Sequence, residues 1–335
     1  MSFAGDHAGG SYLRAYLAHL DAFLAAPDVT DIFVNQPGEV WIERIGAKPE
    51  RHAVPELDAR LLERLARQVA AHVSQGIGRR SPLLAATLPG GARIQVVAPP
   101  ATRGGVALAI RKQAIRDMTL ADCAEAGLFD TVTVGKDAQR ADADATLRDL
   151  LERRAWSEFL VAAVRQRRNI VVSGGTATGK TTFLNALLRE VPHDERLIVI
   201  EDTPEVRLAQ PNVVGLIAVP GESDDPGVSV DALLRAALRM RPSRIVMGEL
   251  RGAEAFSFLR AINTGHPGSI TTLHADSPKR AIEQLALMVL QSGTTLGRAD
   301  VAAYICETVD VFVQLSCTNG RRYVSAIECP TIFQK

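Results

Sequence analysis

A glycine-rich octapeptide constrains this chain of 335 residues more than any other feature. It reads GGTATGKT over residues 174–181 and matches the pattern G-x-x-x-x-G-K-[ST]. An apolar run at 169–172 stands directly before it, and a helical pattern begins directly after it. Glycines let such a loop curl so that its backbone N–H groups point inward, and the next helix directs its positive end to the same point. The octapeptide therefore predicts a phosphate-binding loop between a buried strand and a helix.

The loop and the residue that follows it are predicted to bind ATP. Lys180 should reach the β- and γ-phosphates, and the hydroxyl of Thr181 should hold Mg²⁺. The predicted nucleotide-binding residues are Gly174, Gly175, Thr176, Ala177, Thr178, Gly179, Lys180, Thr181 and Thr182.

Acidic side chains follow two other apolar runs that read as strands. The run 198–200 is followed by Glu201 and, four residues later, by Glu205, while Glu249 follows the run 244–247. The carboxyl ends of parallel strands face one crevice, so both acidic sets should lie opposite the phosphate loop. Because Mg²⁺ and an attacking water need carboxylates there, Glu201 and Glu249 join Thr181 as predicted metal ligands.

Two histidines lie near the same predicted edge of the sheet. His274 ends the predicted strand 269–273, so it should face the crevice and hydrogen-bond the γ-phosphate. His266 stands between Gly265 and the Pro267-Gly268 pair, which favours a turn as much as a functional role.

The chain divides into two predicted domains of different class. Residues 1–127 read as an α+β unit with an antiparallel sheet, in which helices at 13–24 and 57–75 accompany strands at 31–35, 40–44, 92–98 and 106–111. Residues 147–335 alternate strands with helices, which predicts a largely parallel sheet covered by helices and closed by a hairpin at 309–328. The polar stretch 128–146 between them has no apolar period and is predicted to be a flexible or poorly ordered linker.

Composition restricts the partners. Lys plus Arg and Asp plus Glu both number 38 and aromatic residues make up 5%, which argues against a groove that tracks nucleic acid. The four cysteines form no CxxC pair and are expected to be free thiols. Since no apolar stretch approaches the length of a membrane span and the first residues lack an apolar signal core, we expect a cytoplasmic protein with at most peripheral membrane contact.

Four landmarks occur in order along the second half: the phosphate loop, the acidic segment 201–205, Gly248-Glu249, and the segment 271–274. In this they resemble the secretion ATPase superfamily of type II secretion, type IV secretion and type IV pili. The segments 35–41, 238–242, 248–251 and 265–266 are similar to the hexameric ATPases of type IV secretion. The resemblance spans about residues 12–328.

This resemblance implies an α/β fold in which a RecA-like P-loop NTPase domain follows a smaller α+β N-terminal domain. It implies a six-membered ring of identical chains with the nucleotide between the two domains. Mg-ATP hydrolysis would drive movement between the domains and power substrate translocation or pilus assembly. Its partners would be other secretion-system components at the inner membrane, with no sequence-specific nucleic acid among them.

The same resemblance assigns residue roles. Glu205 is similar to the glutamate that polarises the attacking water. Glu249 is similar to the Walker B acid near Mg²⁺, although a Gly-Glu pair stands where an Asp is usual. Arg93 and Arg111 look like the arginines that the N-terminal domain brings onto the phosphates.

Three other functions remain open from the sequence. They are another kind of phosphate-loop enzyme, a ring-forming nucleic-acid motor, and a scaffold that binds ATP to assemble without hydrolysing it. The residues Arg239, Arg241 and Arg251 are candidates to reach a neighbouring subunit, and the cargo stays undetermined.

Overall fold

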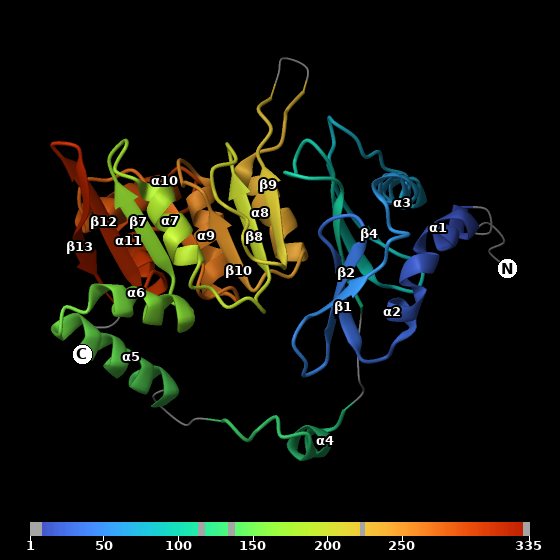
Figure 1. Ribbon diagram of the computed structural model, residues 1–335, viewed down its shortest axis with the longest axis horizontal. Coiled ribbons are helices and arrows are strands. Elements are labelled where there is room, and N and C mark those ends of the chain that lie inside the picture. The colour runs from blue at the N-terminus through green and yellow to red at the C-terminus, as the bar shows by residue number, and fades with distance from the viewer. Residues whose placement is uncertain (1–8, 113–117, 133–137, 222–224, 331–335) are drawn as a thin grey trace.

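The computed structural model describes residues 9–112, 118–132, 138–221 and 225–330, and builds them around two separate β-sheets (Figure 1). We call residues 9–112 the N-terminal half and residues 138–330 the C-terminal half. The two sheets lie side by side, and the described connecting segment 118–132 lies along one side of the molecule (Figure 1).

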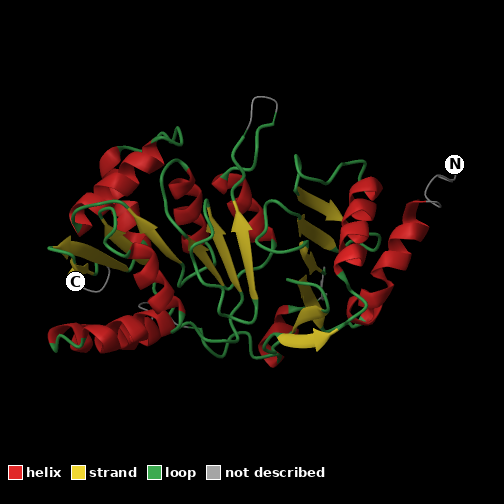
Figure 2. Ribbon diagram, turned by 45° about the horizontal axis from the view of Figure 1, so that its top comes forward, coloured by secondary structure: helices red, strands yellow, loops and turns green. Residues whose placement is uncertain are grey.

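The N-terminal half is a six-stranded antiparallel sheet in the order β3-β2-β1-β6-β5-β4. Helices cover one face of it (Figure 2). Its strands are β1 (Val29–Val34), β2 (Glu39–Arg44), β3 (Glu50–Ala53), β4 (Leu83–Thr87), β5 (Arg93–Val97) and β6 (Ala107–Arg111). Its helical segments are α1 (Gly9–Leu17), the 3-10 turn Ala18–Leu20, α2 (Asp21–Ala25) and α3 (Ala59–His72).

The predicted antiparallel sheet is therefore confirmed, with two strands that the sequence pattern did not reveal. Strand β3 is short, polar and largely exposed, and β4 carries two alanines and no clear alternation. The predicted single helix at 13–24 is wrong in its continuity, because a 3-10 turn separates α1 from α2. Its apolar stripe lies in the core as expected, since Leu13, Leu17 and Leu20 are buried.

The C-terminal half is a seven-stranded mixed sheet in the order β13-β12-β7-β11-β10-β8-β9, in which β13 alone runs antiparallel to its neighbour. Helices pack on both faces (Figure 2). The strands are β7 (Ile170–Gly174), β8 (Leu197–Glu201), β9 (Val213–Ile217), β10 (Arg244–Met247), β11 (Ile270–Leu273), β12 (Val311–Thr318) and β13 (Arg321–Glu328). The helices are α5 (Ala138–Glu152), α6 (Trp156–Arg165), α7 (Lys180–Leu188), α8 (Val230–Arg239), α9 (Glu254–Asn263), α10 (Pro278–Leu290) and α11 (Arg298–Thr308).

The predicted parallel sheet and the closing hairpin are confirmed, and strand β9 is an addition. The irregular linker predicted at 128–146 is wrong over 138–146, which forms the start of α5; residues 133–137 lie outside the described ranges. Leu147 of α5 is buried in an apolar core of the C-terminal half, and Asp144 forms an ion pair with Arg168 at 2.6 Å. A further short helix, α4 (Leu120–Glu125), lies on the connecting chain outside both sheets (Figure 1).

A shared apolar core joins the two halves. Phe33 and Trp41 of the N-terminal sheet belong to the same buried cluster as Leu216 of β9 and Leu233 of α8. Close by, the fully buried Arg196 stacks over the Phe33 ring at 4.0 Å. Burial lowers the pKa of Arg196 to about 9, which leaves its guanidinium charged at neutral pH.

The guanidinium of Arg196 also ties the halves together by hydrogen bonds. It donates to Asn35 at 2.7 Å in the N-terminal half and to Asn212 at 2.6 Å in the C-terminal half. Arg241, after α8, adds contacts of 3.6 Å to Asp31 and to Glu43. The two halves are thus held by apolar burial and by desolvated charge at one interface.

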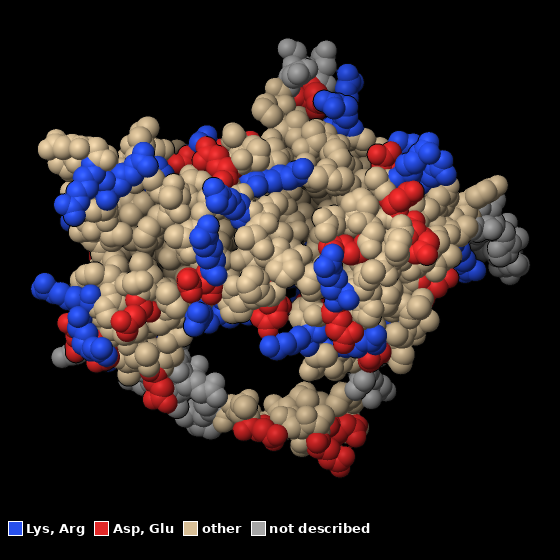
Figure 3. Space-filling model, viewed as in Figure 1, with Lys and Arg blue, Asp and Glu red and all other residues tan. Residues whose placement is uncertain are grey.

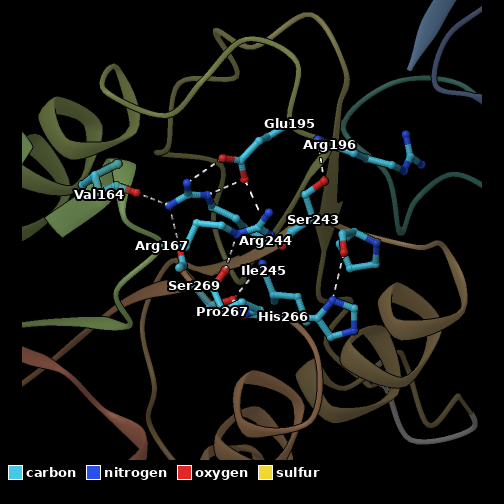
Figure 4. Close-up of polar contacts among 12 residues, drawn as sticks. Val164, Arg167, Glu195, Arg196, Ser243, Arg244, Ile245, His266, Pro267 and Ser269 are labelled. Carbon is cyan, nitrogen blue, oxygen red and sulfur yellow. Dashed lines mark hydrogen bonds and ion pairs between the residues drawn. The ribbon is translucent and has the colours of Figure 1, made fainter. Parts of the chain in front are cut away.

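A second polar cluster lies at the amino ends of the strands (Figure 4). Arg244 makes two hydrogen bonds to Glu195, at 2.6 and 2.7 Å, and donates to the carbonyl of Val164. His266 faces the carbonyl of Pro242 at 2.9 Å in the same cluster. His266 therefore belongs to this structural cluster, at the end of β11 opposite to the one that His274 follows.

Within the described ranges, every helix is too short or too polar to span a bilayer.

Candidate functional site

The candidate site is a cleft of about 450 Å³ at the carboxyl edge of the C-terminal sheet. The segment 176–182 forms one wall of it. The strand order places β11, β10 and β8 next to β7 on one side, so the residues after each of these strands meet around the loop. The cleft is lined by Thr176, Ala177, Thr178, Gly179, Lys180, Thr181, Thr182, Glu201, Asp202, Thr203, Glu205, Gly248, Glu249, Arg251, His274 and Arg322.

The loop has the backbone of an anion nest. Ala177 and Gly179 both adopt positive φ, 61° and 92°, so the chain curls immediately before α7 begins at Lys180. Thr178 closes the turn by donating from its hydroxyl to the carbonyl of Gly175 at 2.9 Å. A curled loop that leads into a helix N-terminus presents several N–H groups to one point, which is the geometry that holds phosphate.

Lys180 lines the cleft and contacts groups from the loop and from two other strand ends. Its Nζ donates to the carbonyls of Gly174 and Gly175 at 3.1 and 3.3 Å. Two further groups approach it: Nδ1 of His274 at 3.3 Å and the carboxylate of Glu249 at 3.7 Å. Burial lowers the pKa of Lys180, and Glu249 opposes that shift. A phosphate chain would add negative charge here and favour the charged lysine.

Glu249 connects three positively charged or donor groups. It lies 3.1 Å from Nε2 of His274 and forms an ion pair with Arg251 at 2.6 Å. Arg251 in turn reaches Asp202 at 3.2 Å. Because its hydrogen-bonded contact with Glu249 favours the charged form, the pKa of Arg251 is raised. The structure thus brings Lys180, Glu249 and His274 together, as the sequence predicted, and adds Arg251 from the same chain.

Glu205 and Thr181 meet on the other side of the loop. The hydroxyl of Thr181 donates to the carboxylate of Glu205 at 2.9 Å. Glu205 reaches this position because the backbone N–H groups of Glu205 and Val206 donate to Glu201, at 2.9 and 2.8 Å. The acidic segment after β8 therefore bends back toward the loop.

Glu201 lines the cleft, but both of its carboxylate oxygens are engaged by other groups. One carboxylate oxygen accepts the two backbone N–H groups, and the other forms an ion pair with Arg103 of the N-terminal half. Its side chain is only 3% exposed. Gly248 lies against it, since a Cβ at that position would be 2.8 Å from Cγ of Glu201. The metal role predicted for Glu201 does not fit this geometry.

Arg93 and Arg111 lie elsewhere. They are cross-strand partners on β5 and β6, and they line a separate cavity of about 620 Å³ together with Arg239 of α8. None of these three arginines has an ion pair among the described residues. Within one chain the structure therefore does not bring Arg93 or Arg111 to the phosphate loop.

Arg322 lines the cleft and was not predicted from the sequence. It lies on β13, which follows β12 beside the loop strand β7, and its Cδ would be 3.3 Å from a Cβ on Gly179. The register of the hairpin, Cys317 opposite Arg322, directs it there. The sequence predicted the hairpin but not its register, so nothing local marked this residue.

The described residues suit a Mg²⁺ ion that keeps several of its water ligands. They contain no cluster of three His, Cys, Asp or Glu side chains arranged to hold a metal. Mg²⁺ is typically bound through one or two protein oxygens, waters and substrate phosphates, and Thr181 with its neighbouring carboxylates offers such oxygens.

Comparison with known proteins identifies the family. The family model "Type II/IV secretion system protein" matches residues 17–321. The type IV secretion system protein VirB11 of Brucella suis is 41% identical over 306 residues, covering 90% of this chain and 84% of its own. The type IV secretion system protein PtlH of Bordetella pertussis is 42% identical over 312 residues, covering 91% of each.

A solved structure agrees with this match. The crystal structure of the VirB11 ATPase from the Brucella suis type IV secretion system, in complex with sulphate, superimposes with a TM-score of 0.87 at 39% identity, covering 95% of this chain and 97% of that one. By sequence and by fold, the chain belongs to the type IV secretion ATPases of the type II/IV secretion system protein family.

Proposed function

We propose that this chain hydrolyses Mg-ATP as a homohexamer and couples hydrolysis to movement between its two halves, powering substrate translocation or pilus assembly by a bacterial type IV secretion system. One observation carries the proposal: a curled loop, its lysine and carboxylates from two neighbouring strands converge in one cleft. Membership of the secretion ATPase family supports the cellular role.

The proposed domain boundaries are those predicted from the sequence. In this proposal residues 147–335 form a RecA-like P-loop domain and residues 1–127 a smaller α+β domain, and the connection between them, 128–146, ends in the first part of α5. The parallel order of β7, β11, β10 and β8 supports it, because this order gathers the loop and the acidic residues at one edge.

The chain's own residues act by position and charge. The loop N–H groups, Lys180 and Arg322 hold the phosphates and stabilise the negative charge that develops on them. His274, within 3.3 Å of Lys180, hydrogen-bonds the γ-phosphate. Glu205 orients a water in line with the γ-phosphorus. Catalysis of this kind is mostly positioning and electrostatic stabilisation.

Thr181 and Glu249 are the proposed holders of Mg²⁺, with Glu205 close by. When bound, the ion supplies positive charge to the phosphate oxygens. The 2.9 Å hydrogen bond between Thr181 and Glu205 supports this proposal, because it makes the metal-binding residue and the water-orienting residue neighbours.

Arg93 and Arg111 are proposed to act on a neighbouring subunit's nucleotide. With Arg239 they line a cavity separate from the cleft of the phosphate loop in the same chain. Three arginines that form no ion pair with the described residues make a strong anion site, and a closed ring would allow this surface to meet the next subunit's cleft. Losing the γ-phosphate would remove this contact and release the neighbouring half, which gives a route to movement.

The proposed partners are further copies of the chain and other secretion-system components at the inner membrane, with peripheral membrane contact and no sequence-specific nucleic acid. Basic and acidic side chains are interspersed on the face shown in Figure 3, which does not favour a nucleic-acid track on that face. Because the relatives are secretion-system proteins, the proposed location is the cytoplasm at the inner membrane.

Phosphate release by the purified protein tests the proposal. Wild type should release phosphate from Mg-ATP, and Lys180→Ala should reduce the rate to about 1% or less because the main phosphate contact is lost. Unchanged turnover in Lys180→Ala would overturn the assigned site. ATP binding without any phosphate release by wild type would favour the scaffold function instead.

A further inference from the structure

A loop of the N-terminal half reaches into the C-terminal half beside the acidic segment. This loop connects β5 to β6 and carries Arg103. Its backbone is bonded to the edge strand β9: the N–H of Arg103 donates to Gly215 and the N–H of Ile217 donates to Ala101, both at 3.0 Å. The loop thus extends the C-terminal sheet at its free edge.

The side chain of Arg103 then passes over β9 toward the site. Its stem lies on Gly215, where a Cβ would be 2.7 Å from Cδ of Arg103, so any larger residue at 215 would displace the arginine or its neighbours. The guanidinium forms an ion pair with Glu201 and donates to the carbonyl of Val206 at 2.5 Å. Glu201 is buried, with 3% of its side chain exposed, and Arg103 is partly buried, with 17% exposed, so the pair is largely shielded from solvent.

Glu201 holds the backbone of the segment that carries Glu205. Its other oxygen accepts the N–H groups of Glu205 and Val206, and the carboxylate of Glu205 accepts from Thr181. A continuous set of contacts therefore leads from Arg103, through Glu201 and the backbone at 205–206, to the hydroxyl beside the phosphate loop.

We propose that Arg103 is a positioning residue through which the N-terminal half holds Glu205 of the same chain in its place for water activation. The inference rests on the proposed function. Arg103 does not line the nucleotide cleft. It neutralises the buried Glu201 and fixes the carbonyl of Val206, so the segment 202–206 has one arrangement while the two halves are docked. Movement of the N-terminal half withdraws the guanidinium, and leaves a buried carboxylate unpaired and the segment free to shift.

The proposal gives the two sets of N-terminal arginines different tasks. Arg93 and Arg111 face a cavity away from their own chain's loop, whereas Arg103 acts on its own chain's acidic segment. Hydrolysis in one subunit would then require that subunit's own N-terminal half to be docked.

The test uses the full-length chain with Arg103→Met, which keeps the apolar stem on Gly215 and removes the guanidinium. Lys48→Met is the matched control, because Lys48 and Asp194 form another ion pair between the halves, at 2.8 Å, on the exposed surface. Two quantities are measured: the steady-state kcat and KM for Mg-ATP, and hydrogen exchange of peptides over 202–208 and over 174–190.

We expect Arg103→Met to lower kcat at least about tenfold with KM changed less than about twofold, because nucleotide contacts remain. The rate of hydrogen exchange in peptides over 202–208 should rise at least about tenfold, while the rate in peptides over 174–190 stays as in wild type. Lys48→Met should match wild type in both measurements. Unchanged exchange over 202–208 in Arg103→Met, or an equal loss of nucleotide binding and kcat, overturns the proposal.

Hydrogen exchange separates this inference from the proposed function. If wild type does not hydrolyse ATP, the proposed function fails, yet exchange still reports whether Arg103 holds the segment. If Arg103→Met does not fold, Arg103→Lys replaces it, since one ammonium cannot span both Glu201 and the Val206 carbonyl, and the same two results are expected in the same direction.

Discussion

The hydroxyl of Thr181 and the carboxylate of Glu205 are hydrogen-bonded at 2.9 Å, although the first belongs to the helix after the phosphate loop and the second to the segment after β8. This contact joins the proposed metal-binding residue to the proposed water-orienting residue. It exists because Glu201 turns the segment back toward the loop with two backbone hydrogen bonds.

Arg322 is predicted to contribute to nucleotide affinity. Its guanidinium lies beside Gly179 in the cleft, where it would pair with a phosphate oxygen. Because hydrogen bonds to charged groups contribute about 1.5–3 kcal/mol and this side chain is exposed, Arg322→Ala should weaken ATP binding by about fivefold to tenfold. Titration with a fluorescent ATP analogue measures it.

The neighbouring Arg321 is the control for that experiment. It is also exposed and basic but does not line the cleft, so Arg321→Ala should bind ATP as wild type does. Equal affinity losses in the two variants would mean that general positive charge, and not the placement of Arg322, is what matters.

Action of Arg93 across subunits predicts complementation. Arg93→Ala lacks the donated arginine and Lys180→Ala lacks a working loop, so each alone should be nearly inactive. In rings assembled from both, an intact loop meets an intact arginine at about a quarter of the contacts between neighbours. ATPase activity of the mixture should then rise to about that fraction of wild type. Activity that never exceeds the mean of the two variants would show that Arg93 acts within its own chain.

His266 predicts a specific dependence of stability on pH. Burial lowers the pKa of His266 from its ordinary value of 6.5. As pH falls through 6.5 the unfolded chain binds this proton before the folded chain does, so the free energy of unfolding decreases below that pH. His266→Asn keeps a donor for the Pro242 carbonyl and should flatten the decrease. Urea unfolding at pH 7.5 and 5.5 measures it, with the exposed His19 changed to Asn as control; an unaltered slope in His266→Asn would contradict the assignment.

The phosphate loop could be predicted because its information is local. Glycines, a lysine and a threonine at set spacing, with a strand before and a helix after, require no knowledge of the rest of the fold. The gathering of Glu249 and His274 also followed, since both end strands of one parallel sheet and such ends share an edge.

Other features depend on contacts between distant parts of the chain. The sequence could not tell that Glu201 turns to Arg103 while Glu205 turns to Thr181, because both acids follow the same strand. The first part of α5, residues 138–146, was interpreted as linker because its pattern lacks an apolar stripe; the helix packs there through the buried Leu147 and the ion pair of Asp144 with Arg168. The cavity shared by Arg93, Arg111 and Arg239 depends on how the two halves dock.

Glu205→Gln tests the central claim most directly, because it keeps the shape of the side chain and removes the charge that would orient the water. Phosphate release and ATP affinity should be measured on the same full-length preparation with Mg-ATP. The account predicts that the rate of phosphate release falls at least about a hundredfold while the affinity for ATP stays within about twofold of wild type. A Glu205→Gln variant that releases phosphate at the wild-type rate would contradict it.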